Sequence, residues 1–381
     1  MQSEVLNYKN EQWDGLVNFP FSKQEVQLII CFADRALLEK GTLFSTLKKE
    51  FVNARIITCS TAGEISGRNV ENNSAVIMAI KFDKTIFNIS KGNIKDEKNS
   101  FDLGKNTANL LSKEELKYVL ILSDGNLVNG DELIEGIQSA LDPAVIVSGG
   151  IAGDGDRFQK TFVGLDSDIS EGNVVLLGLY GTHIRVGTNY QGGWDVFGPE
   201  KIITRSNGNI LYEIDNENAL DLYKKYLGKY ASELPSSALL FPLSIKSENS
   251  NNFIVRTILS IDETNKSMKF AGNLPQGSIV RFMKSNFDRL VLAASEAGIK
   301  ATANLENDVK ANLAIVVSCV GRKIVLSDRI GEEVEAAIDN ISEGAKIAGF
   351  FSYGEIAPQD KAHRSYLHNQ TITITTLAEL P

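Results

Sequence analysis

The sequence predicts an α/β protein with mixed β-sheets, built from duplicated βαβ-type units and divided into two domains. Three strand-like apolar runs end in a loop where a glycine precedes an acid, and these acids are Glu64, Asp154 and Glu355. Another strand-like run lies upstream of each loop and ends at residue 31, 123 or 318. The loop glycines at 63, 153 and 354 follow these ends by 63 − 31 = 32, 153 − 123 = 30 and 354 − 318 = 36 residues. This spacing is that of a βαβ unit with a right-handed crossover.

Each unit is expected to contain a strand, a helix, a second strand that ends at the glycine, and a further strand beyond the loop. Continuous apolar runs of this length are typical of strands buried on both faces. The first strands are expected at 26–31, 118–123 and 313–318, the helices at 37–52, 133–141 and 332–341, and the further strands at 74–80, 173–179 and 371–377.

The remaining segments suggest where the domains divide. Residues 1–24 are polar and are expected to form an N-terminal arm or a lead-in helix. Alternation over 201–214 around a turn at 206–209 predicts a hairpin, and a helical stripe over 218–230 follows. We therefore expect an arm at 1–24, a first domain at 25–220 and a second at 221–381. Within the second, strands are expected at 253–261, 267–270 and 278–283, and a helix at 287–298.

Composition excludes several functional classes. A formal charge of −9 and a pI near 5.1 argue against nucleic acid as a partner. No apolar run approaches the roughly 18 to 20 residues of a membrane helix, and the first ten residues do not resemble a secretory signal. Three cysteines without metal-ligand spacing favour reduced thiols, a cytoplasmic location and the absence of a metal or other cofactor.

Several motifs together resemble the FIST domain family over roughly residues 25–366. Segments 59–65, 150–154, 192–199 and 211–220 resemble its N-terminal half, and segments 272–278, 318–322 and 349–358 resemble its C-terminal half. The resemblance implies a cytoplasmic sensory module that binds small ligands such as amino acids and is often fused to kinase, cyclase or chemotaxis output domains. We expect no output domain in this chain, and therefore either signalling through a separate partner of the kinase or chemotaxis type or a role other than signalling.

The three acids are the first candidates for a ligand site, because α/β sheets present ligands at strand ends. An acid would meet the ammonium group of an amino acid, and the guanidinium of Arg322 would hold its carboxylate. Alternatively, each acid caps its own loop, or Arg322 forms a salt bridge with Glu355. Arg35 carries the same ambiguity. The candidate ligand-binding residues are Ser60, Thr61, Gly63, Glu64, Gly150, Gly153, Asp154, Cys319, Arg322, Tyr353, Gly354 and Glu355.

Two other functional classes stay open at this point. An enzyme could use the acids as general acid and base, or an ionised Cys59 or Cys319 as a nucleophile, although no histidine lies in these loops. The glycine-rich segment 148–156 lacks the pattern of a P-loop or a dinucleotide site. Trp194 and Tyr353 are candidates for an aromatic wall over an ammonium group. The third class is a scaffold that only binds a protein partner.

Overall fold

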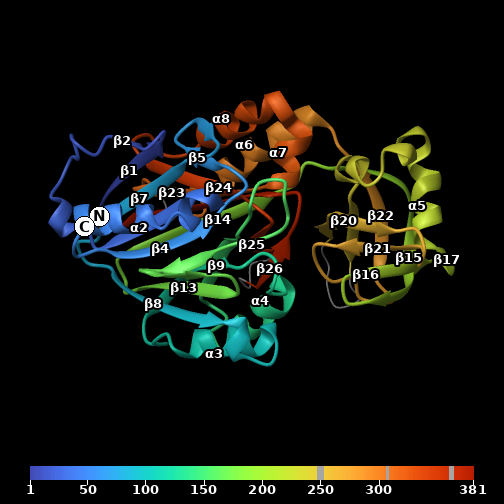
Figure 1. Cartoon of the computed structure of the whole chain (residues 1–381), viewed down its shortest axis with the longest axis horizontal. Helices are drawn as coiled ribbons and strands as arrows, with labels where there is room; N and C mark the ends of the chain where they lie inside the picture. Colours follow the sequence, from blue (N-terminus) through green and yellow to red (C-terminus); the bar gives the residue numbers. More distant parts are fainter. Residues whose placement is uncertain (247–252, 306–308, 360–363) are drawn as a thin grey trace.

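The computed structural model describes residues 1–246, 253–305, 309–359 and 364–381, and it confirms the α/β class. Three mixed sheets with helices on their outer faces form the main body, and a fourth sheet lies to one side (Figure 1). The helices are α1 (Arg35–Glu39), α2 (Thr42–Glu50), α3 (Ser100–Asn109), α4 (Gly130–Ser139), α5 (Ala219–Leu227), α6 (Phe287–Ala303), α7 (Val320–Leu326) and α8 (Ile330–Ile338).

Each predicted βαβ unit supplies the centre of one sheet as a parallel strand pair: β3 with β4, β9 with β10, and β23 with β24. The first sheet contains β1 (Gln2–Lys9), β2 (Gln12–Asp14), β3 (Leu28–Ala33), β4 (Arg55–Ser60), β7 (Ala75–Lys81), β11 (Val163–Leu165) and β12 (Asp168–Ser170). The second contains β8 (Ile86–Asn93), β9 (Leu116–Ser123), β10 (Ile146–Ile151), β13 (Asn173–Tyr180), β25 (Gly354–Pro358) and β26 (Ser365–His368). The third contains β5 (Glu64–Ser66), β6 (Asn69–Glu71), β14 (Ile184–Gln191), β23 (Leu313–Cys319), β24 (Lys346–Ser352) and β27 (Ile372–Glu379).

The three units exchange hairpins in a closed cycle. Hairpin β5–β6 of the first unit pairs with β24 of the third, hairpin β25–β26 of the third pairs with β10 of the second, and hairpin β11–β12 of the second pairs with β4 of the first. After the second strand of each parallel pair, the chain therefore crosses to the edge of a neighbouring sheet, where it forms the hairpin. Because the glycine-acid loops lie at these crossings, the exchange brings all three loops to one place.

Both faces of the central strands are buried, which explains their continuous apolar sequences. On β3, Ile30 and Phe32 face a core shared by all three sheets, whereas Ile29 packs toward α2. The ring of Phe32 stacks on that of Phe350 with centroids 4.8 Å apart. Helices α3 and α4 cover the second sheet, and α6 and α8 cover the third.

The N-terminal residues differ from the expected arm. Strand β1 pairs antiparallel with β7 along its length, and its Leu6 is buried. The segment therefore extends the first sheet, with Val5 packed against the core shared by the three sheets and Leu6 in the separate core that includes α2. The helix predicted at 37–52 is divided into α1 and α2 at Gly41, which adopts a left-handed φ of 71°.

The fourth sheet is inserted between the third sheet's strand β14 and its helix α6. It contains β15 (Asp195–Asn207), β16 (Ile210–Ile214), β17 (Glu217–Asn218), β18 (Leu243–Lys246), β19 (Ile254–Arg256), β20 (Ile258–Asp262), β21 (Ser267–Phe270) and β22 (Ile279–Lys284). The expected boundary near residue 220 lies inside this sheet, and β14 belongs to the third sheet. Arg256 docks the insert by donating to Asp131 of α4 at 3.0 Å and to the Leu367 carbonyl at 2.8 Å.

Candidate functional site

The three glycine-acid loops are joined directly by backbone hydrogen bonds. The loop after β4 contacts both others, and the loop after β24 contacts the one after β10, so every pair of loops is linked. The bonds run from Gly153 N to Ser60 O (2.9 Å), Gly155 N to Thr61 O (3.2 Å), Ala62 N to Phe351 O (2.8 Å), Phe351 N to Gly63 O (2.8 Å) and Tyr353 N to Ile151 O (3.1 Å). Three segments far apart in sequence thus form one structure at the carboxyl ends of the parallel strands.

Glu64 is fully buried and held by hydroxyl groups. Its carboxyl oxygens accept from Thr61 Oγ1 and from Ser74 Oγ, each at 2.5 Å. Burial raises the pKa of Glu64 to about 7, against the hydrogen bonds from Ser74 and Thr61, which lower it. The carboxyl group therefore stabilises its own loop and attaches it to the segment before β7.

Glu355 repeats this arrangement in the third unit. Ser352 Oγ donates to one oxygen at 2.6 Å, and Thr371 donates to the other from Oγ1 at 2.7 Å and from its backbone N at 3.1 Å. Burial raises the pKa of Glu355 to about 7, although the hydroxyl and amide donors act in the opposite direction. Both glutamates match the interpretation in which each acid caps its own loop, and a contact with ligand stays a prediction.

A pH experiment tests the burial of Glu64. Between its ordinary pKa of 4.5 and about 7, the folded protein keeps a proton that the unfolded chain releases, so ionisation destabilises the fold as pH rises through this window. Glu64→Gln removes the titration and keeps the shape, since both hydroxyl partners can rotate. The free energy of unfolding of the variant relative to wild type is expected to rise from pH 4.5 to 7 and then level off.

Urea unfolding at a series of pH values measures this difference. Glu332→Gln is the control, because the hydrogen bond from Arg329 lowers the pKa of that exposed carboxyl, and its titration lies on the acid side of the window. A constant difference between Glu64→Gln and wild type over pH 4.5 to 7 would contradict the raised pKa of Glu64.

Asp154 differs from the two glutamates because it joins all three units. Its Oδ2 accepts from Arg35 Nη1 at 2.9 Å and from the backbone N–H groups of Gln159 and Lys160 at 3.2 and 3.0 Å. Its Oδ1 accepts from the hydroxyl of Tyr353. One fully buried carboxylate therefore holds its own loop, the first unit through Arg35 and the third unit through Tyr353.

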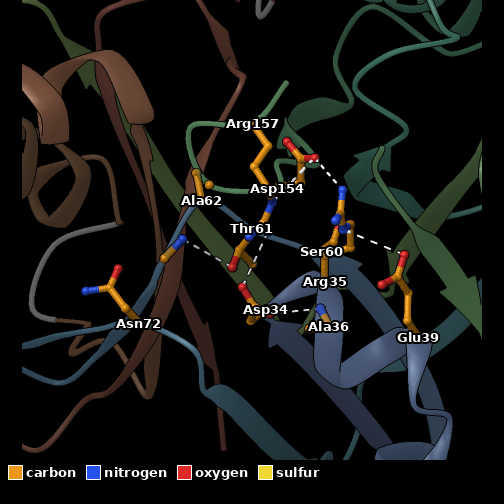
Figure 2. Close-up of polar contacts among 12 residues, drawn as sticks. Asp34, Arg35, Ala36, Glu39, Ser60, Thr61, Ala62, Asn72, Asp154 and Arg157 are labelled. Atoms are coloured by element: carbon orange, nitrogen blue, oxygen red, sulfur yellow. Dashed lines mark hydrogen bonds and ion pairs between the residues drawn. The ribbon is translucent and has the colours of Figure 1, made fainter. Parts of the chain in front are cut away.

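Charged side chains of both signs, among them Asp34, Arg35 and Arg157, surround this buried carboxylate (Figure 2). Asp34 caps α1 by accepting from Ala36 N at 2.8 Å, and it lies 3.6 Å from Arg157. Arg157 also lies 3.8 Å from Asp154, and its side chain is 37% exposed. Both ion pairs of Arg157 are longer than a hydrogen bond, so its guanidinium is the least engaged of the group.

Lys323 brings a cation from the third unit to the first loop, a contact that the sequence did not reveal. Its Nζ donates to the Ala62 carbonyl at 2.7 Å and to Asn72 Oδ1 at 2.5 Å. Burial lowers the pKa of Lys323. Gly63 has a φ of 127°, a backbone conformation that favours glycine, and a Cβ there would lie 2.2 Å from this Nζ and displace it.

Arg322 does not form the predicted pair with Glu355. Its Nε and Nη2 bind Glu333 Oε2 of α8 at 2.9 and 2.8 Å, and both side chains are fully buried. Its other donors bind the carbonyls of Gly192 and Leu290. These two carbonyls lie where the chain leaves for the inserted sheet and where it returns. Arg322 therefore fixes the base of the insert, and no donor is left for a ligand carboxylate.

The cysteines and histidine lack the environment of a nucleophilic pair. All three thiols are free and buried, and burial raises the pKa of Cys31, to about 12, and that of Cys319. His368 is buried against Tyr190, and burial lowers its pKa to about 3. Trp194 donates to the Gln370 carbonyl at 2.7 Å and is buried.

The remaining candidates occupy packing positions around the loops. Ser60 Oγ accepts from Phe162 N at 2.9 Å, and the ring of Tyr353 stacks on that of Phe158. A Cβ at Gly153 would lie 3.0 Å from Ala62 N, so this glycine permits the close contact of two loops. Gly150 and Gly354 lie within β10 and β25. Within the described ranges, no helix is long and apolar enough to cross a membrane, and no group of three or more His, Cys, Asp or Glu side chains is arranged to hold a metal.

This architecture defines the class as a mixed α/β protein with three loop-linked units and an inserted sheet. Family models match nearly the whole chain, the FIST N domain over residues 27–217 and the FIST C domain over residues 219–358. The chain therefore belongs to the FIST family, as the sequence motifs indicated.

The relatives share limited sequence identity with the chain. It is 22% identical to the uncharacterized protein MJ1623 of Methanocaldococcus jannaschii, over 85% of this chain and 69% of that protein. It is 24% identical to the uncharacterized protein Rv0628c of Mycobacterium tuberculosis, over 68% of each chain. A solved cyanuric acid hydrolase from A. caulinodans aligns with a TM-score of 0.36 and 9% identity, over 100% of this chain and 99% of that one. A similarity at that level supports no argument about fold or activity.

Proposed function

We propose that the protein is a sensor of a small zwitterionic ligand, an amino acid, which binds where the three loops meet. The observation that carries the proposal is that the three linked loops lie beside charged side chains of both signs, Asp34, Arg35 and Arg157. Membership of the FIST family supports a sensory role. A ligand that contacts two or three loops would change the relative stability of their arrangements, which is what a sensor requires.

The charges suit the two ends of an amino acid. Among the described residues, the guanidinium of Arg157 has only the long contacts to Asp34 and Asp154, so a ligand carboxylate would gain bidentate hydrogen bonds from it. Asp34, once its pairing with Arg157 is exchanged for the ligand, would accept from the ammonium group. The proposed ligand contacts are therefore Arg157 and Asp34. They replace the predicted contacts Arg322 and Glu355, whose polar atoms already have hydrogen-bond partners within the protein.

The structure favours binding over acid-base catalysis at the same place. The pKa values of Glu64 and Glu355 near 7 suit proton transfer in principle. Both carboxyl groups are fully buried, however, and each oxygen already accepts from a neighbouring donor. The cytoplasmic location and the signalling partner of kinase or chemotaxis type remain part of our proposal, and they rest on the unpaired cysteines and on the family resemblance.

Arg157→Ala is expected to weaken amino-acid binding by roughly ten- to a hundred-fold, the effect of losing charge-assisted hydrogen bonds. The stability of the ligand-free protein should change little, because both ion pairs of Arg157 are long and partly exposed. Isothermal titration calorimetry with the twenty L-amino acids provides the measurement. Arg205→Ala, which removes a comparably exposed arginine paired with Glu213 in the inserted sheet, is the matched control.

The outcome separates the proposal from its alternatives. If no amino acid produces binding heat or raises the melting temperature of the wild-type protein, the amino-acid sensor is ruled out. If an amino acid binds Arg157→Ala as tightly as wild type, the ligand lies elsewhere and the proposed site is wrong.

A further inference from the structure

The segment between β26 and β27 carries buried polar atoms that lack hydrogen-bond partners. Asn369 and Gln370 are both fully buried. Both amide atoms of Gln370, Oε1 and Nε2, and the Oδ1 atom of Asn369 have no partner among the described residues. Burying such atoms unpaired costs free energy, and native proteins rarely tolerate it without a compensating group. Three such atoms on two consecutive residues therefore call for a specific explanation.

Hydrogen bonds hold the backbone of this segment to the base of the inserted sheet and to the third loop. The Gln370 carbonyl accepts from Trp194 Nε1 at 2.7 Å and from Arg322 Nη1 at 3.4 Å. Gln370 adopts a left-handed φ of 60°, which interrupts the alternation of side chains between the two faces of a strand. The next residue, Thr371, donates to Glu355 of the third loop. The unpartnered amides are therefore attached to the same framework as the loops.

Glycines lie against both side chains. A Cβ at Gly321 would approach Gln370 Nε2 to 2.6 Å and Oε1 to 2.8 Å, and a Cβ at Gly354 would lie 3.6 Å from Asn369 Nδ2. Any side chain at position 321 would push the Gln370 amide out of its place. The Asn369 orientation is defined by its Nδ2, which donates to the His368 carbonyl at 3.1 Å and leaves Oδ1 as the unpaired acceptor.

The unpaired atoms specify the chemistry of a complementary group. Two acceptors, Asn369 Oδ1 and Gln370 Oε1, require two donors, and the donor Gln370 Nε2 requires an acceptor. An ammonium group supplies donors only, and a carboxylate supplies acceptors only. A primary carboxamide supplies two N–H donors and one carbonyl acceptor. We propose that Asn369 and Gln370 recognise the carboxamide group of a small ligand, an amino acid of the asparagine or glutamine type. This inference rests on the proposed amino-acid sensor and specifies its ligand.

Calorimetry with matched ligand pairs tests the inference on the full chain. The probes are L-glutamine against L-glutamate and L-asparagine against L-aspartate, which differ only in the recognised group. Wild type is expected to bind one of the amides at least ten-fold more tightly than the matching acid. Gln370→Met, which keeps the length of the side chain and removes its polar atoms, should abolish that preference while the melting temperature of the ligand-free variant stays the same or rises.

Two further variants keep the test decisive. Ser90→Ala removes another buried, unpartnered polar atom, on β8, and should leave the preference unchanged. If Gln370→Met does not fold by circular dichroism, Gly321→Ala displaces the same amide and should also reduce the preference at least ten-fold.

Equal binding of amide and acid to wild type, or an unchanged preference in the folded variants, would overturn the carboxamide inference and leave the amino-acid sensor intact. Buried water molecules would then be the only hydrogen-bond partners of these two amide side chains. Absence of binding by every amino acid would overturn both proposals.

Discussion

Glu333→Gln is expected to lower the free energy of unfolding by about 3 to 5 kcal/mol, the usual effect of breaking a buried ion pair. Glu333 accepts from Arg322 and from Ser318 Oγ, at 2.7 Å for the latter, and neither member of the ion pair is exposed. The substitution leaves a buried guanidinium without its counter-charge. The same guanidinium binds the Gly192 and Leu290 carbonyls, so the loss should also loosen the base of the inserted sheet.

Urea unfolding followed by circular dichroism measures this effect, and limited proteolysis near residues 192–194 reports on the base of the insert. Glu332→Gln is the matched control, because Glu332 is the preceding residue on α8 and is 51% exposed. The double variant Arg322→Met with Glu333→Leu should recover most of the lost stability, since apolar replacement of a buried pair is often neutral. Equal stabilities of Glu333→Gln and wild type would show that the pair is solvated.

Asp154→Ala is expected to cost about 2 to 4 kcal/mol, because it leaves a largely buried arginine and two backbone N–H groups without their acceptor. Arg35 is 18% exposed, so solvent compensates part of the loss, and the effect should be smaller than at Glu333. The three units lose a common attachment at the same time. Hydrogen exchange should therefore increase in all three loops.

Asp156→Ala is the control for this change, because Asp156 lies two residues further on and is exposed. Thermal and urea unfolding of the two variants, together with hydrogen exchange by mass spectrometry, provide the comparison. Faster exchange confined to residues 155–160 would mean that Asp154 organises only its own loop, contrary to its role as the link between units.

The central strands and the βαβ units could be predicted, because the order of apolar and polar residues within a short stretch of sequence determines them. Apolar runs indicated β3, β9 and β23, which are six to eight residues long, and the similar spacing of 30 to 36 residues indicated the βαβ units. The exchange of hairpins could not be predicted, since the short hairpin strands β5 and β11 pair with residues far away in the sequence. The inserted sheet was seen as separate strands, but no local feature showed that they form one unit that continues across residue 220.

The meeting of the three loops could be predicted, whereas the side-chain contacts among them could be predicted less well; ligand binding there stays a prediction. Glycine followed by an acid at each strand end correctly indicated three loops, and the structure joins them. Neither interpretation of Arg322, a ligand carboxylate or a salt bridge with Glu355, included its partner Glu333. The charged run around Glu333 is typical of an exposed helix face, and only tertiary packing buries this position. Lys323 and Gln370 gave no signal, because an isolated lysine or glutamine is ordinary in sequence.

A crystal structure of the protein with the amino acid that gives the largest thermal shift tests the central claim most directly. We predict ligand density over the three linked loops, with its carboxylate within hydrogen-bond distance of Arg157 and its ammonium group near Asp34. Density in the separate surface hollow lined by Glu135 and Asp142, or loops that carry no ligand while binding is saturated in solution, would contradict it.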